Sequence, residues 1–198
     1  MVAIIDYDTG NLRSVMNALE RKGVEYIVTS DIETLRSADR VILPGVGEAS
    51  TAMEKLRERG LDTLIPTLTQ PVLGICIGLQ LMCESSQEGD AECMGIFSTK
   101  VVKLPCEDTS GQRLKVPHVG WDTIEELSSP LFEGIELGSH FYYVHSFCAE
   151  LCEQSIATTT YGVKFSAALH RDNFYGAQFH PEKSGDVGEK IIENFLKL

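Results

Sequence analysis

One cysteine in this sequence stands in a setting that suits nucleophilic chemistry. Cys76 follows the short apolar run 71–75 and lies between Gly74 and Gly78, each two residues away. The apolar run predicts a strand, and the amphipathic residues after the cysteine predict a helix from about Ile77. Glycines at this spacing allow a sharp corner, as in the Gly-x-nucleophile-x-Gly turn of hydrolases. We therefore expect an exposed sulfur whose thiolate form is favoured by the nearby helix N-terminus.

The alternative interpretation of Cys76 is structural, because most free cysteines are small buried hydrophobic residues. Cys83 provides the contrast, since it lies about two helical turns further on without a neighbouring glycine. We expect Cys83 to be a core residue, whereas the glycine pair favours a chemical role for Cys76.

A cysteine nucleophile needs a base, and the segment His180-Pro181-Glu182 offers one. The proline disfavours helix and favours an extended conformation at His180. Residues two apart in an extended chain point to the same side, so Glu182 can hold one ring nitrogen while the other faces a thiol. A surface turn after a strand is the simpler interpretation, and His145 at a predicted strand end is a second candidate base.

The segment Pro44-Gly45-Val46-Gly47 follows a predicted strand directly. Gly-x-Gly at a strand end lets the backbone approach a ligand closely and point its N–H groups outward. Taken alone, such a segment is more often a tight turn. Its position favours a role in binding, because ligands of open α/β sheets lie beyond the carboxyl ends of the strands.

Strands and helices alternate through the first part of the chain, which predicts a parallel sheet. Later segments are aromatic-rich and joined by turns, which predicts antiparallel strands before a helix from about Val187. Residues 85–115 are expected to form a hairpin-rich excursion with an exposed tip at 107–111. The predicted fold is α/β, an open, mostly parallel twisted sheet with helices on both faces and an antiparallel β extension. The expected strands are 2–6, 24–28, 40–43, 72–75, 95–97, 101–104, 140–147, 155–161, 165–169 and 174–179.

Composition limits the possible roles of the chain. With 198 residues, of which 43% are hydrophobic, we expect a single domain over 1–198. A formal net charge of −12 disfavours nucleic acid or an anionic membrane as partner. The first residues contain no basic leader and no apolar run long enough for a signal peptide or membrane span, so we expect a cytoplasmic protein. The six cysteines and five histidines have no zinc-type spacing, and we expect no metal and no cofactor.

Three ordered motifs resemble those of the class I (triad) glutamine amidotransferases: residues 74–80, 44–47 and 178–182. Within that family, residues 6–15, 117–121 and 143–147 look like those of the HisH family, the glutaminase subunits of imidazole glycerol phosphate synthase. The resemblance runs from end to end of the chain. It implies hydrolysis of glutamine to glutamate and ammonia in histidine biosynthesis.

The resemblance also implies roles for individual residues. Cys76 would attack the glutamine side-chain amide and form a thioester, with His180 as base and then acid and Glu182 orienting His180. Backbone N–H groups in two segments would hold the oxyanion, namely those of Ile77 and of Val46 and Gly47. Three further residues would line the glutamine pocket: Gln80, Ser146 and Phe147.

In the family the resemblance points to, ammonia passes to a cyclase partner with a (β/α)8 barrel, which implies a heterodimer. The single tryptophan lies in segment 117–122, which we expect to be a loop. A tryptophan is usually a core residue, but in this position it could anchor an interface. Candidate docking residues are Asn11, Arg13, His118, Trp121 and Lys183, with Lys183 stacked on Trp121.

The sequence departs from the family pattern at two places, and other functions remain open. Asp122 stands where the family commonly has asparagine, and Asp8-Thr9 replaces a pair of small residues. Both positions bear on the partner, so a paralogous glutaminase that feeds another synthase, such as one making an amidino sugar, is the main alternative. A peptidase-like or deglycase-like protein and a non-catalytic scaffold are the others, and the combination of the three motifs disfavours them.

Overall fold

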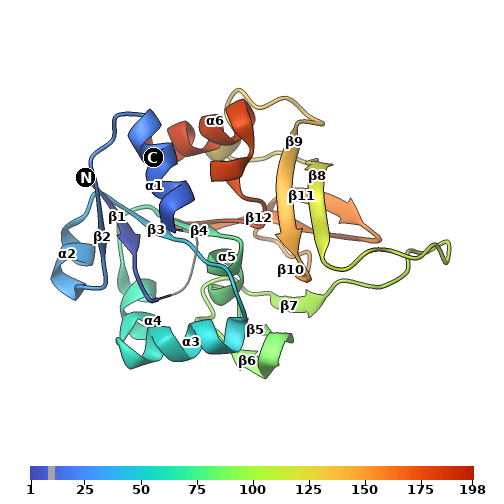
Figure 1. The fold of residues 1–198 in the computed structure, drawn as a ribbon, viewed down its shortest axis with the longest axis horizontal. Helices are drawn as coiled ribbons and strands as arrows, with labels where there is room; N and C mark the ends of the chain where they lie inside the picture. Colours follow the sequence, from blue (N-terminus) through green and yellow to red (C-terminus); the bar gives the residue numbers. More distant parts are fainter. Residues whose placement is uncertain (9–11) are drawn as a thin grey trace.

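The central feature of the computed structural model, which describes residues 1–8 and 12–198, is a seven-stranded sheet (Figure 1). Five neighbouring strands pair in parallel, and the remaining two continue the sheet by antiparallel pairing. This confirms the predicted fold class. In sheet order the strands are β11 (Ser155–Tyr161), β12 (Val163–Arg171), β13 (Phe174–Ala177), β4 (Val72–Ile75), β3 (Arg40–Leu43), β1 (Val2–Ile5) and β2 (Tyr26–Thr29).

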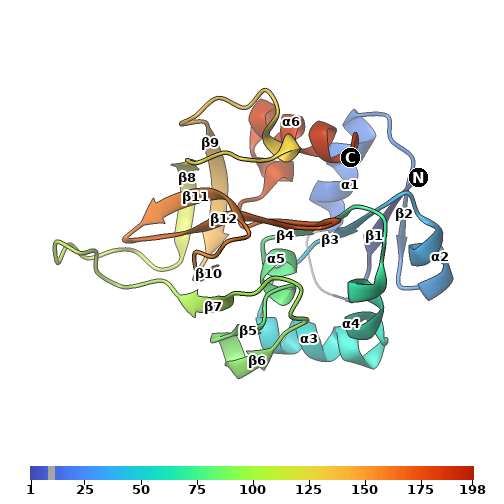
Figure 2. The same ribbon diagram turned by 180° about the vertical axis from the view of Figure 1, so that it is seen from behind.

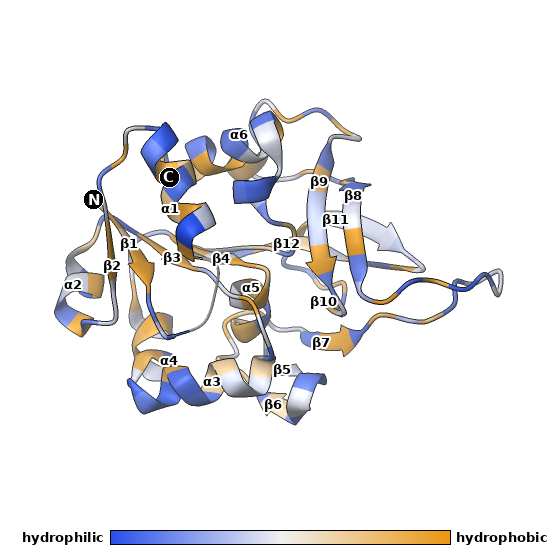
Figure 3. Ribbon diagram, in the orientation of Figure 1, coloured by the Kyte–Doolittle hydropathy of each residue, from blue (hydrophilic) through white to orange (hydrophobic). Residues whose placement is uncertain are grey.

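Helices cover both faces of this sheet (Figures 1 and 3). Apolar side chains alternate along the inner strands, so that Ile4 packs on one face while Ala3 and Ile5 pack on the other. The first face is covered by α1 (Leu12–Arg21) and α6 (Gly185–Phe195). The opposite face is covered by α2 (Ile32–Ser37), α3 (Ala49–Glu58), α4 (Leu61–Leu64) and α5 (Ile77–Leu81).

Two smaller sheets flank the antiparallel side (Figure 2). One has the order β10 (Phe147–Ala149), β7 (Lys100–Lys103), β5 (Ser85–Ser86), β6 (Ala91–Glu92). The other pairs β8 (His118–Thr123) with β9 (His140–His145). The connection from β7 to β8 projects from the body of the protein, and the predicted tip at 107–111 lies on it. The expected strand at 95–97 is wrong, because those residues form bends and irregular chain.

Short 3-10 helices complete the chain. They are η1 (Ile65–Thr67), η2 (Glu88–Asp90), η3 (Pro130–Phe132) and η4 (Pro181–Lys183). Of the helices within 1–8 and 12–198, none has both the length and the apolar character that crossing a bilayer requires. Three features of the sequence analysis lie outside these ranges: Thr9, the candidate docking residue Asn11, and the part of the predicted turn 8–11 that follows Asp8.

The segment 117–122 is not the expected loop, since most of it forms strand β8. Its alternation is inverted relative to a normal amphipathic strand. His118 is buried, whereas Val119 and Trp121 on the opposite face are more than half exposed. A strand that turns polar side chains inward and apolar ones outward lacks the pattern by which strands are recognised in sequence.

Candidate active site

Cys76 occupies a strained corner between β4 and α5. Its φ of 53° and ψ of −107° lie outside the regions that a residue with a side chain ordinarily adopts, at a cost of about 1–3 kcal/mol. The Cys76 N–H donates to the Ala177 carbonyl at 2.7 Å, which fixes the corner to the neighbouring strand. A Cβ at Gly78 would lie 1.9 Å from the Leu43 carbonyl oxygen, so only glycine fits at that position. The predicted strand-to-helix corner is thus confirmed.

The sulfur is less accessible than we expected. Only 4% of Cys76 is exposed, and its sulfur contacts Val144 of β9 and Gln178, which follows β13. Its Sγ lies 4.0 Å from the Val144 carbonyl oxygen and 3.7 Å from Nε2 of Gln178. The thiol instead faces a pocket of about 190 Å³. The following helix has only five residues, so its dipole is shorter than the sequence suggested.

His180 reaches the same pocket, held by an adjacent carboxylate. The His180 Nδ1–H donates to Glu182 Oε1 at 2.8 Å, and both side chains are only 2% exposed. The expected contact is present, but the expected reason is wrong. His180 is extended, whereas Pro181 begins the 3-10 turn η4, and this turn rather than a continued strand brings Glu182 under the ring.

The other ring nitrogen of His180 is available for chemistry. Its Nε2 is buried and forms no hydrogen bond with any of the described residues. Burial lowers the pKa of His180, but interactions with Cys76 and Glu182 outweigh this effect and raise the pKa to about 9. A buried ring nitrogen without another partner, in the same pocket as a thiol, can accept the proton of the sulfur when the two groups come within hydrogen-bond reach.

His145, the second candidate base, has both ring nitrogens engaged. Its Nδ1–H donates to the Phe147 carbonyl at 2.8 Å, and its Nε2 lies 3.2 Å from Nδ1 of His118. Burial lowers the pKa of His145 to about 3, so the ring stays neutral. The structure therefore favours His180 over His145 as the base.

The predicted pocket residues lie around the thiol. Gln80, Ser146 and Phe147 line the pocket together with Val46, Gly47 and Ile77. The Gln80 Nε2 donates to the Phe147 carbonyl at 2.8 Å and to Gln178 Oε1 at 3.0 Å. The Gln80 Oε1 is buried and has no hydrogen-bond partner within the described chain, so the pocket presents an acceptor that a ligand can use.

Glu88, which was not expected from the sequence, brings a carboxylate to this pocket. Its Oε2 accepts the Ala49 N–H at 3.0 Å and so caps the start of α3, for which the N-cap residue Glu48 provides no side-chain bond. Burial raises the pKa of Glu88. Because Glu88 begins the short 3-10 helix η2 between β5 and β6, no period or spacing indicated that it would line the pocket of the thiol.

Comparison with known proteins places this geometry in a family. The family model for class-I glutamine amidotransferases matches residues 3–198. The chain belongs to this glutamine amidotransferase family. It is 54% identical to the imidazole glycerol phosphate synthase subunit HisH of Bacteroides fragilis, over 100% of this chain and 99% of the relative. The HisH subunit of Haemophilus influenzae is 46% identical, over 99% and 96%.

Two solved structures share the fold of this chain. A putative GMP synthase component from Thermoplasma acidophilum superposes with a TM-score of 0.76 at 20% identity, over 99% of this chain and 92% of the other. A structure described as a glutamine amidotransferase gives a TM-score of 0.75 at 20% identity, over 100% and 98%. At this level of identity the likeness concerns the fold alone.

The candidate docking residues of this glutamine amidotransferase differ in where the structure places them. Trp121 is 55% exposed and Arg13 is also exposed, as a surface contact requires. His118 is buried between the rings of Tyr143 and Tyr161, so its assignment to the surface is wrong. Lys183 does not stack on Trp121, because its Nζ lies 5.9 Å from the centre of the Tyr142 ring. Asn11 lies outside the described residues.

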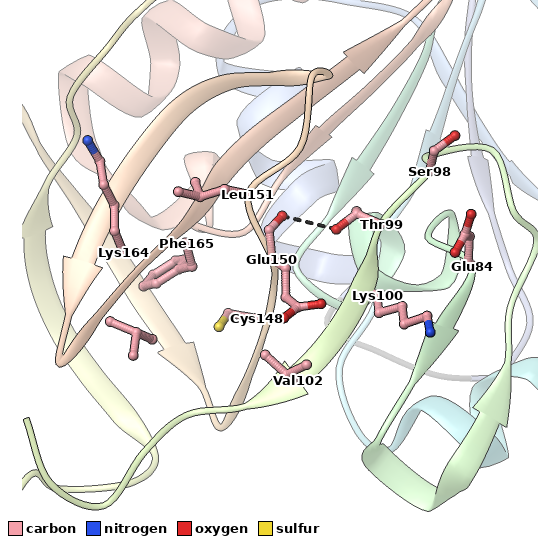
Figure 4. Close-up of a pocket in the computed structure, with 11 residues that line it drawn as sticks. Glu84, Ser98, Thr99, Lys100, Val102, Cys148, Glu150, Leu151, Lys164 and Phe165 are labelled. Carbon is pink, nitrogen blue, oxygen red and sulfur yellow. Dashed lines mark hydrogen bonds between the residues drawn. The ribbon is translucent and has the colours of Figure 1, made fainter.

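A larger hollow of about 620 Å³ lies away from the thiol of this glutamine amidotransferase (Figure 4). It is formed between β7, β10 and β12, and Thr99 Oγ1 donates to the Glu150 carbonyl across it at 3.0 Å. Burial raises the pKa of the Cys148 thiol in its wall to about 12, which keeps that thiol protonated. None of Cys76, His180 and Glu182 lines this hollow.

The lowered pKa of His145 makes the stability of this glutamine amidotransferase sensitive to acid. His145 becomes protonated below about pH 6.5 in the unfolded chain, but only near pH 3 in the folded chain. We expect the free energy of unfolding to fall by up to about 1.4 kcal/mol per pH unit in this window through His145 alone. Urea unfolding from pH 7 to 4 should show a shallower slope for His145→Asn than for the wild type. His140→Asn, at an exposed histidine, should keep the wild-type slope; equal slopes for all three proteins would contradict the assignment.

Proposed function

We propose that this chain hydrolyses L-glutamine to glutamate and ammonia through a thioester on Cys76. We further propose that it supplies the ammonia to the cyclase subunit of an imidazole glycerol phosphate synthase in histidine biosynthesis. The observation that carries the proposal is one pocket that holds a thiol on a strained corner and a histidine braced by a carboxylate. The strong similarity to HisH subunits over the full chain supports the choice of pathway.

The reaction follows from the placement of these groups. Nε2 of His180 takes the proton of the Cys76 thiol, and the sulfur attacks the side-chain amide carbon of glutamine. The protonated His180 then gives its proton to the departing nitrogen, the C–N bond breaks, and ammonia leaves. Water, deprotonated by the same ring, hydrolyses the thioester to glutamate and restores the thiol. Glu182 stabilises the imidazolium that forms twice in the cycle.

Backbone N–H groups near the sulfur are suited to hold the oxyanion. Ile77 is the first residue of α5, so its N–H has no partner within the helix. Val46 and Gly47 line the same pocket, and a Cβ at the preceding Gly45 would lie 2.8 Å from Cβ of Ile77, so the two segments are neighbours. Gly47 has a φ of 107°, which favours glycine. We assign the oxyanion to these two segments, at about 3 kcal/mol of transition-state stabilisation per donor.

The same pocket has groups for the two ends of the substrate. We assign Gln80, Ser146 and Phe147 to binding of glutamine, with the free Gln80 Oε1 as an acceptor for a substrate N–H. Glu88 supplies a carboxylate for the α-ammonium group of the amino acid. A bound ammonium favours the ionised form of Glu88 and offsets the effect of burial.

A substitution at the nucleophile tests the chemistry. In the complex with the cyclase, we expect Cys76→Ala to lower glutamine-dependent synthesis by at least about 1000-fold and to leave ammonia-dependent synthesis intact. An electrophilic glutamine analogue should label Cys76, as mass spectrometry of the digested protein would show. Cys106→Ala, at an exposed cysteine, is the control and should behave as the wild type. Label on another cysteine, or full glutamine use by Cys76→Ala, would rule the proposal out.

A second substitution tests the assignment of the substrate ammonium. Glu88→Gln keeps an oxygen that can cap Ala49 but removes the charge, so the fold should persist. A hydrogen bond to a charged group is worth about 1.5–3 kcal/mol, and we expect KM for glutamine to rise about 10- to 100-fold with little change in kcat. Steady-state kinetics should show no such rise for Glu92→Gln, at an exposed carboxylate nearby. A normal KM in the Glu88 variant would exclude this role.

The partner side of the proposal rests on the outward face of β8. Val119 and Trp121 expose apolar surface there, and the Trp121 ring contacts Tyr142 edge-on with 6.1 Å between ring centres. Tyr142 in turn accepts the His180 N–H through its carbonyl at 2.9 Å and lies under Lys183. We propose that a cyclase with a (β/α)8 barrel docks on Trp121, Lys183 and Arg13, within two contacts of the base.

We also propose a cytoplasmic location, which suits a protein whose cysteines are all free thiols. A heterodimer formed through β8 would bury the exposed tryptophan and bring the ammonia source beside the partner.

Removal of the exposed indole should weaken the complex. Interface tryptophans commonly contribute about 2 kcal/mol or more, so we expect Trp121→Ala to raise the Kd for the cyclase at least about 30-fold. Calorimetric titration of the two purified proteins would measure this change. Leu137→Ala removes a side chain that is 74% exposed elsewhere and should leave Kd unchanged. Equal effects of the two substitutions would place the interface on another face.

A further inference from the structure

Two buried histidines outside the proposed chemistry contact each other beside the pocket. His118 on β8 and His145 on β9 are paired in the register of the two strands, and they are 4% and 6% exposed. Nδ1 of His118 lies 3.2 Å from Nε2 of His145. Two imidazoles can form this contact only when one nitrogen carries a proton and the other does not.

On the inner side, the pair continues to the thiol through an unbroken series of polar contacts. The His145 Nδ1–H donates to the Phe147 carbonyl at 2.8 Å, and Gln80 Nε2 donates to the same carbonyl at 2.8 Å. Gln80 Nε2 also reaches Gln178 Oε1 at 3.0 Å, and Gln178 Nε2 lies 3.7 Å from Cys76 Sγ. The orientation of the pocket amides therefore depends on the position of one carbonyl, which His145 holds.

On the outer side, the pair ends at a carboxylate. Oδ2 of Asp122 lies 3.4 Å from Nε2 of His118, and the Asp122 side chain is partly exposed. Because the Phe147 carbonyl can only accept, His145 carries its proton on Nδ1 and its Nε2 is bare. His118 must then donate from Nδ1. If the His118 ring is neutral, its Nε2 carries no proton and cannot donate to the Asp122 carboxylate. A second proton, on Nε2 of His118, is needed for the contacts with both His145 and Asp122 to be hydrogen bonds.

Of the other groups around the two histidines, neither tyrosine donates a hydrogen bond to them, and His180 disfavours a charge on His145. Tyr143 and Tyr161 stack on the two sides of His118, with ring centres 5.1 Å and 4.0 Å away, and their hydroxyls bond to other groups. The charge of His180 acts on His145 and disfavours a proton there. Burial lowers the pKa of His118, and Asp122 opposes this effect.

We propose that Asp122 is a positioning residue for glutamine binding, which acts through the contact between His118 and His145 to hold the Phe147 carbonyl and the Gln80 amide in place. This inference rests on the proposed function, since the pocket it organises is the glutamine pocket. The series of contacts is complete when His118 is protonated, so glutamine binds more tightly on the acid side of the His118 titration. Deprotonation leaves one contact unsatisfied and loosens the pocket.

The isosteric change Asp122→Asn isolates this role. An asparagine NH2 group can donate to the bare Nε2 of neutral His118, which completes the series without a second proton. In the complete synthase complex, we expect KM of the wild type for glutamine to rise about fivefold as pH increases through the His118 titration, the equivalent of one hydrogen bond. KM of Asp122→Asn should stay flat over the same range, while the pH profile of kcat is shared.

The matched control is Asp172→Asn, which removes the same charge from an exposed turn between β12 and β13. This turn precedes the start of β13, whereas Cys76 follows the end of the parallel strand β4. The Asp172→Asn variant should keep the wild-type rise in KM. Parallel KM profiles for the wild type and both variants would overturn the proposal.

A readout that needs no turnover separates this proposal from the proposed function. In the full chain labelled with 15N at histidine, the ring nitrogens of His145 should report a neutral ring with the proton on Nδ1 throughout the range. His118 should gain its second proton at a higher pH in the wild type than in Asp122→Asn. A proton on Nε2 of His145, or one and the same titration of His118 in both proteins, would overturn the proposal. A chain that failed to hydrolyse glutamine would overturn the proposed function. The 15N signals would still show whether His145 carries its proton on Nδ1 or on Nε2, and whether Asp122 affects the titration of His118.

Discussion

The hydrogen bond from the Cys76 N–H to the Ala177 carbonyl is the contact on which the site depends. It ties a corner with positive φ to the end of the adjacent strand and so maintains a conformation that costs about 1–3 kcal/mol by itself. The close approach of Gly78 to the Leu43 carbonyl fixes the other side of the corner. With both restraints, the direction of the Cys76 side chain is set by the sheet and not by a loop.

The same pair of strands explains how residues far apart in sequence meet. β4 and β13 are parallel neighbours, with Ile75 opposite Ala177, and both chains leave the sheet at the same edge. The residue after Ile75 is the nucleophile, and three residues after Ala177 comes His180. Gln178, between them, contacts both the thiol and Gln80. Strand register therefore determines the geometry of the site, and the 3-10 turn at Pro181 adds the carboxylate.

The sequence allowed prediction of features that depend on local chain geometry. Glycine spacing predicted the corner at Cys76, and the alternation of strands and helices predicted the parallel sheet. The aromatic-rich segments joined by turns predicted its antiparallel extension. The contact of His180 with Glu182 was predicted, but through an extended chain and not the turn that forms. The degree of burial of Cys76 was not predicted, because its sulfur contacts Val144 and Gln178, which are distant in sequence.

Features that depend on contacts between distant segments could not be predicted. The pairing of His118 with His145 arises from the register of β8 and β9, and β8 itself was missed because its apolar side chains point outward. That inversion is informative once the fold is known, because exposed apolar residues on a strand indicate a surface that a partner covers. Glu88 gave no signal, since a single carboxylate at the start of a three-residue 3-10 helix forms no recognisable pattern.

The proposed mechanism requires that the thiol on this corner becomes covalently bonded to the substrate. Rapid acid quenching of the complex during turnover of glutamine, followed by mass spectrometry of the peptide that contains Cys76, measures this directly. We expect a γ-glutamyl group on Cys76 that appears within one turnover and decays when glutamine is exhausted. Turnover without this adduct, or an adduct on a different side chain, would contradict it.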